Sequence, residues 1–154
     1  TQKWRVFATL PGLIHHNIPG LPGVNDGAEP HGFARSYFAV DYAHPAGEYF
    51  SEFRGRLAPP TASRFLGLYA MGSVGSACFT SASDIDFWLI YPSGAFSATE
   101  RLWVQEKLEA IERWAHETAQ LEIHFYLHDL GEIQKATFSY DTESAGEFGP
   151  ILKE

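Results

Sequence analysis

Two aspartates separated by one residue, Asp84 and Asp86, are the side chains in this sequence best suited to bind a metal ion. They open the segment 84–91, in which apolar residues occupy every second position, as in a β-strand. Residues two apart on a strand point to the same face, so the two Cα atoms lie on the order of 7 Å apart. Neighbouring carboxylates repel each other and bind a hard cation such as Mg²⁺ or Mn²⁺, together with substrate phosphate oxygens.

A third carboxylate can come from Glu122, at the start of a second alternating segment, 121–128. A helix between the two predicted strands brings the chain back to the same sheet. If the strands are neighbours, Glu122 shares the face of Asp84 and Asp86. Three carboxylates could then hold two metal ions, which bind the attacking and leaving oxygens of an in-line phosphoryl displacement.

A Gly-Ser pair, Gly72-Ser73, follows the apolar segment 64–71 and suits contact with a phosphate. Glycine allows the backbone to approach closely, and N–H groups at a helix N-terminus, with the Ser73 hydroxyl, can donate to phosphate oxygens. Ser83 directly precedes Asp84 and could steady the strand end or the ligand. Simpler interpretations exist, since an Asp-x-Asp is often a solvated strand end and a Gly-Ser pair is often only a turn.

Strands and helices must position these residues, and the pattern predicts a strand over 64–71, a short helix over 73–80, strands over 84–91 and 121–128, and a helix over 97–118. Ser97 and Glu100 form a capping box at the start of that helix. Its apolar stripe recurs at helical spacing and comprises Val104, Leu108, Ile111 and Ala115. We expect Trp103 and Trp114 to widen the stripe as core residues.

The other segments are predicted from turn-forming residues. Proline and glycine predict an irregular segment over 1–35, where Leu10-Pro11-Gly12 should not continue a helix. We expect a loop over 42–50, a single turn over 51–57 and a strand near 136–140. The whole chain, 1–154, is predicted to be one α/β (α+β) domain with a mixed sheet flanked by helices, in which 1–60 is irregular and 61–140 is the catalytic core.

Composition restricts the partners. The chain has 154 residues and a formal net charge of -8, so it lacks the cationic surplus that binds long nucleic acids. A small anionic ligand held with a divalent metal fits better, because the metal supplies positive charge. One cysteine allows no internal disulfide, and no apolar run approaches the roughly 20 residues of a membrane span. We therefore expect a cytoplasmic protein without a membrane span. Because the sequence starts at Thr1 without Met, we also expect a fragment of a longer chain.

The motif as a whole resembles a known family. Met-Gly-Ser, nine residues, then Ser-Asp-x-Asp-x-Trp is similar to the nucleotidyltransferase superfamily that includes DNA polymerase beta. More narrowly, LYAMGSVGSACFTSASDIDFWLIY resembles the class I adenylate cyclases of bacteria. The resemblance continues through ERLWVQEKLEAIERWA and LEIHFYLHD, and upstream through LIHHNIPGLPG, so it covers most of the chain.

The resemblance implies a nucleotidyltransferase-like fold and conversion of ATP to 3′,5′-cyclic AMP with release of pyrophosphate. It implies that Asp84 and Asp86 bind Mg²⁺ or Mn²⁺, that Glu122 is the candidate third acid, and that Gly72 and Ser73 contact the triphosphate. Several basic residues could neutralise the phosphates, and the sequence does not select among Arg54, Arg56, Arg64, Arg101 and Lys135.

Two other functions fit the same residues. The fold could transfer a nucleotide to a protein or small-molecule acceptor, or it could bind nucleotide without catalysis. The product formed from ATP separates the first of these from a cyclase. The sequence identifies neither the base preference nor a regulatory protein partner.

Overall fold

The computed structural model describes residues 1–34, 42–55, 57, 63–71 and 84–143, the last seven of these by their backbone alone. The elements follow the order α1 (Gln2–His15), α2 (Ala43–Tyr49), a 3₁₀ turn η2 (Ser51–Arg54), β1 (Gly67–Met71), β2 (Ile85–Tyr91), α3 (Ala98–Ala119), β3 (Ile123–Asp129) and α4 (Leu130–Glu143). Predicted features at residues 35–41, 56, 58–62, 72–83 and 144–154, the short helix over 73–80 among them, lie outside the described residues.

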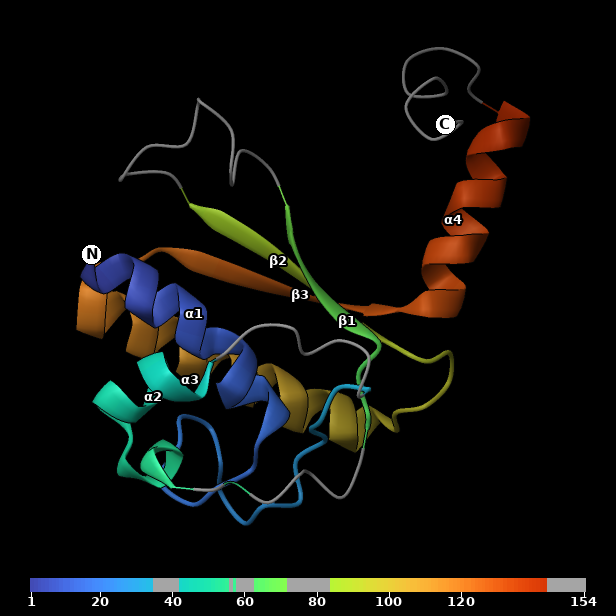
Figure 1. The fold of residues 1–154 in the computed structure, drawn as a ribbon. Helices are drawn as coiled ribbons and strands as arrows, with labels where there is room; N and C mark the ends of the chain where they lie inside the picture. Colours follow the sequence, from blue (N-terminus) through green and yellow to red (C-terminus); the bar gives the residue numbers. More distant parts are fainter. Residues whose placement is uncertain (35–41, 56, 58–62, 72–83, 144–154) are drawn as a thin grey trace.

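The described strands form one mixed sheet in the order β1-β2-β3. β1 pairs antiparallel with β2, and β2 pairs parallel with β3 through the crossover helix α3. Figure 1 shows α1, α2 and α3 gathered on one side of the sheet, whereas α4 leaves the end of β3 and projects away from this helical layer. The predicted mixed α/β class is therefore confirmed. Within the described ranges, none of the helices is long and apolar enough to cross a membrane.

The core lies between this helical layer and the inner face of the sheet. The predicted capping box opens α3: the Glu100 N–H donates to Ser97 Oγ (3.1 Å), and the Ser97 N–H donates to Glu100 Oε2 (2.9 Å). The predicted apolar stripe is confirmed, since all its residues are buried: Val104, Leu108, Ile111 and Ala115. Trp114 packs against the core, with its ring 5.3 Å from that of Phe50. The prediction for Trp103 is wrong, because this residue is 38% exposed.

Helix α1 contradicts the predicted irregular start of the chain, since Pro11 lies inside it. Proline in a helix interior removes one hydrogen bond and costs about 3 kcal/mol. Burial outweighs this cost, because each fully buried aliphatic side chain stabilises the fold by about 1.5–3 kcal/mol. The buried stripe of α1 comprises Val6, Leu10, Leu13 and Ile14. Residues 17–32, which follow the helix, contain neither helix nor strand, as predicted.

Two further segments differ from prediction, and in both the local signal was too weak to show a helix. The predicted loop over 42–50 contains α2, which buries Ala46 and Gly47 against neighbouring elements. The predicted strand near 136–140 lies within α4. The predicted single turn over 51–57 is confirmed as η2, which buries Phe53.

A buried polar network joins the loop after α1 to α3. The Lys107 side chain is only 2% exposed, and its Nζ donates to the carbonyl oxygen of His16 (3.0 Å) and to Oδ1 of Asn17 (2.5 Å). Asn17 Nδ2 donates to the carbonyl oxygen of Glu29 (2.5 Å), and the Glu29 carboxylate accepts from the N–H of Asn25 (2.9 Å). Burial lowers the pKa of Lys107 to about 7, while the charge of Glu29 acts in the opposite direction.

His15 and His16 lie beside this network, and from their burial we expect a loss of stability in mild acid. Burial lowers the pKa of His15 and of His16 to about 4, and His15 Nδ1 accepts from the Phe33 N–H (3.0 Å), which requires that nitrogen to be unprotonated. An unfolded chain binds these protons near pH 6.5. As the pH falls from 6.5 to 4, the unfolded state therefore takes up protons that the folded state excludes. We expect the free energy of unfolding to fall by about 2 kcal/mol per histidine between pH 7 and pH 5.

Urea-induced unfolding of the chain at pH 7 and pH 5 measures this dependence. The variant His15→Gln keeps an acceptor for the Phe33 N–H but does not titrate in this range, so about half of the contribution should disappear. If His15→Gln shows the same difference between the two pH values as the wild type, the assignment to His15 is wrong.

Candidate active site on the open face of the sheet

The aspartate pair lies on the face of the sheet opposite α1 and α3. Asp84 directly precedes β2 and is exposed, and Asp86 is half-buried. Ile85 and Phe87 point the other way and are 2% and 4% exposed, with the Phe87 ring 5.7 Å from that of Phe7 in α1. A register shift by one residue would bury the aspartates and expose these apolar side chains, so the core fixes the acids on the open face.

The strand register shows which residues flank Asp86. Its partners are Met71 at the end of β1 and His124 in β3. Paired residues on neighbouring strands point to the same face. Met71 is 37% exposed and His124 is exposed, so this end of the open face is accessible from solvent.

Glu122 lies beside Asp84 in the backbone register but has a side-chain partner on α3. The Ile85 N–H donates to the carbonyl oxygen of Glu122 (3.1 Å), so β2 and β3 begin side by side, as the predicted third acid requires. The Glu122 side chain pairs with His116, with 2.7 Å between Oε1 and Nδ1. Both side chains are about half exposed, at 51% and 48%, so the pair is weak and can be exchanged for another partner.

The predicted phosphate-binding residues Gly72, Ser73 and Ser83 lie outside the described residues. The described neighbours show where this segment starts and ends in the sheet. β1 ends at Met71, the register partner of Asp86, and the chain re-enters the described structure at Asp84. The two described residues that flank this segment, Met71 and Asp84, therefore lie at the aspartate pair.

Arg64, one of the basic residues considered for phosphate binding, has a structural role. Its Nη2 donates to Glu100 Oε1 (2.8 Å) and to the carbonyl oxygen of Ala95 (3.0 Å), and its guanidinium lies 5.0 Å from the Phe96 ring centroid. Hydrogen bonds from Ser97, then from Arg64, hold the pKa of Glu100 below its usual range. Arg64 therefore connects the segment before β1 with the loop between β2 and α3 and with the first turn of α3.

Arg101 and Lys135 lie at the wrong end of the sheet for the aspartates. Arg101 is in the first turn of α3, which follows the carboxyl end of β2. Lys135 is in α4, which follows the carboxyl end of β3. Asp84 and Asp86 are at the amino end of β2, and β3 runs parallel to it. Arg56, the remaining candidate apart from Arg54, lies outside the described residues.

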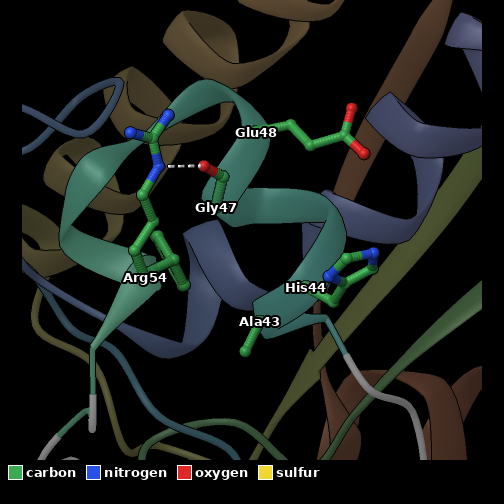
Figure 2. Close-up of a pocket in the computed structure, with 6 residues that line it drawn as sticks. Ala43, His44, Gly47, Glu48 and Arg54 are labelled. Atoms are coloured by element: carbon green, nitrogen blue, oxygen red, sulfur yellow. Dashed lines mark hydrogen bonds between the residues drawn. The ribbon is translucent and has the colours of Figure 1, made fainter.

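A pocket of about 440 Å³ lies on the helical layer instead of on the open face, and is lined by Ala43, His44, Gly47, Glu48, Phe53 and Arg54 (Figure 2). Arg54 Nε donates to the carbonyl oxygen of Gly47 (2.7 Å), so this arginine is also structural. Glu48 pairs with Arg5 of α1, at 2.9 Å. In Figure 2 the charged groups of Arg54 and Glu48 point in different directions, so they do not converge on one ligand.

The described residues contain no group of three or more His, Cys, Asp or Glu side chains arranged to hold a metal ion. Two carboxylates are nevertheless a sufficient protein contribution for Mg²⁺, which is commonly bound by one or two carboxylates plus substrate phosphates and water. The oxygen chemistry of Asp84 and Asp86 therefore fits a metal ion that arrives with a phosphorylated ligand.

Comparisons with known proteins identify the family. A family model described as the adenylate cyclase NT domain matches residues 1–152. Adenylate cyclase of Yersinia pestis is 30% identical over 154 residues, which cover 96% of this chain and 18% of that protein. Adenylate cyclase of Haemophilus influenzae is 34% identical over 139 residues, 80% of this chain and 16% of that protein.

Adenylate cyclase of Escherichia coli K12 is 31% identical over 128 residues, 81% of this chain and 15% of that protein. The chain thus spans less than a fifth of the length of these curated relatives. No solved structure gave a significant match. The family model covers nearly the whole chain, and the chain therefore belongs to the adenylate cyclase NT-domain family.

Proposed function

We propose that this chain supplies the metal-binding part of an adenylate cyclase that converts ATP to 3′,5′-cyclic AMP and pyrophosphate. The proposal rests on the aspartate pair on the open face of β2, where Met71, the residue before Gly72, is the register partner of Asp86. The names of the relatives, all adenylate cyclases, support this choice of reaction. A cytoplasmic location belongs to the same proposal.

In this proposal Asp84 and Asp86 would hold Mg²⁺ or Mn²⁺, and Glu122, which pairs with His116 in this structure, would be the third acid. Bound metal would lower the pKa of the ATP 3′-hydroxyl and neutralise charge on the pyrophosphate leaving group. Gly72 and Ser73 contact the triphosphate, and Ser83 steadies the start of β2. The 3′-oxygen attacks the α-phosphorus, the bond to the bridging oxygen breaks, and the hydroxyl proton passes to solvent. Since phosphoryl transfer depends mainly on positioning and charge neutralisation, the parallel pairing of β2 with β3, which places these acids, is central.

Product analysis of the full-length protein with α-labelled ATP and Mn²⁺ tests this function. We expect the label in cyclic AMP, with one pyrophosphate released for each molecule formed. Label on a protein or small-molecule acceptor would instead identify an adenylyltransferase. Saturable ATP binding without any product would identify a nucleotide-binding module, and either result would contradict the proposed cyclase.

A further inference from the structure

A row of three aromatic residues lies next to the acids on the open face. Tyr69 of β1 and Tyr126 of β3 are both register partners of Trp88 in β2, so the row crosses every strand of the described sheet. Tyr69 is 45% exposed and Tyr126 is 48% exposed. The helical layer of α1, α2 and α3 lies against the other face of the sheet, so this row faces away from that layer (Figure 1).

The position of this row fits a nucleotide whose phosphates lie at the aspartates. It is two residues along β2 from Asp86, which corresponds to about 7 Å at the rise of a strand. That separation is comparable to the distance between the phosphates and the base in a nucleotide. His128 packs against Trp88 from the side away from Asp86, with ring centroids 4.6 Å apart. This contact fixes the middle residue of the row.

The side chains of the row are also better suited to bind a nucleotide base than to pack against an aliphatic surface. Its two strongly exposed members are phenols, which offer a flat apolar face for stacking while the hydroxyl remains in water. Bases stack on such side chains irrespective of sequence because every base has a π-face. The aromatic row lies next to the row formed by Asp86 and its register partners Met71 and His124. One ligand can therefore contact the aromatic residues and the aspartates together.

We propose that Tyr126, together with Tyr69 and Trp88, forms the platform on which the purine base of the nucleotide stacks while its triphosphate reaches Asp84 and Asp86. This inference rests on the proposed function, because it uses the same ligand. In this inference the aromatic row binds the base, and Asp84 and Asp86 serve the chemical step.

Binding of a fluorescent purine nucleotide, 2-aminopurine riboside triphosphate, to the full-length protein with Mn²⁺ tests the platform, because stacking quenches its emission. Tyr126→Ala should weaken binding about tenfold, as expected for loss of one base–aromatic stack, and reduce the quenching. Tyr126→Phe keeps the ring and should bind like the wild type. Trp4→Ala removes another exposed aromatic residue, 65% exposed on α1, and should have no effect.

Inorganic tripolyphosphate with Mn²⁺ separates the platform from the acids, since it has no base. Tyr126→Ala should bind it as tightly as the wild type does. Equal weakening of nucleotide and tripolyphosphate would show that Tyr126 only supports the fold, and would overturn the inference. If the protein forms cyclic AMP and Tyr126→Ala binds the nucleotide normally, the platform is wrong while the proposed function stands. A wild type that binds no nucleotide would overturn both.

Discussion

Asp86→Asn in the full-length protein should slow cyclic AMP formation by about a thousandfold, which corresponds to a loss of about 4 kcal/mol of transition-state charge stabilisation. Asparagine keeps the size of the side chain and should keep its place in β2 between Met71 and His124. It removes the negative charge that, in the proposed site, would hold the metal. The initial rate at saturating ATP, together with Mn²⁺ affinity from titration followed by electron paramagnetic resonance, measures both effects.

A matched variant controls for loss of charge elsewhere. Glu106→Gln neutralises an exposed carboxylate on α3, in the helical layer behind the sheet, and should leave the rate and the Mn²⁺ affinity unchanged. An Asp86→Asn protein that retains more than about a tenth of the wild-type rate and binds Mn²⁺ as before would contradict the metal role. The expected effect is large because phosphoryl transfer gains most of its acceleration from charge neutralisation and positioning.

Elements with a strong local period could be predicted from the sequence. The alternation over 84–91 and 121–128 corresponds to β2 and β3, and the capped stripe of 97–118 corresponds to α3. In each case burial follows the pattern, because the same apolar residues form one side of the core. Two of the elements that were not predicted, α1 and α2, contain proline and glycine, and tertiary burial outweighs their local preferences.

The candidate site was only partly predictable for a different reason. The period of a strand placed Asp84 and Asp86 on one face, but no local pattern gives the register between strands. The register showed that Tyr69 and Tyr126 flank Trp88, and a sequence pattern could not. Nor could it show that Glu122 pairs with His116, which depends on how the chain leaves α3 after Ala119, where the C-cap Gln120 has a positive φ of 50°.

The buried position of Lys107 could have been predicted from the sequence, because a signal for it is present. It lies three residues after Val104 and four before Ile111, and therefore within the apolar stripe of α3. A lysine at such a position either extends to solvent or needs buried acceptors. Here the loop after α1 supplies them, and a Cβ at Gly23, whose φ is +71°, would collide with the Lys107 backbone.

Lys107→Met should therefore lower the free energy of unfolding of the chain by about 3 kcal/mol, even though methionine suits a helix interior. The substitution leaves the carbonyl oxygen of His16 and Oδ1 of Asn17 without their donor. It also removes an amine that is partly charged at pH 7 and interacts with the buried Glu29 carboxylate. Urea-induced unfolding at pH 7 measures the change. Lys135→Met removes an exposed lysine from α4 and should change stability by less than about 0.5 kcal/mol.

The pH dependence distinguishes loss of this network from a simple packing defect. The pKa of Lys107 is about 7 in the folded chain, against an ordinary value of 10.5 for a solvated lysine. Between pH 7 and pH 10.5 the unfolded chain therefore binds more protons than the folded chain does. Wild-type stability should consequently rise as the pH increases from 7 to 9, and Lys107→Met should lack this rise. Adding Glu29→Gln to Lys107→Met should recover part of the loss, because no unpaired charge then stays buried. A loss under 1 kcal/mol, or the same pH slope in the variant as in the wild type, would show that Lys107 does not hold the loop to α3.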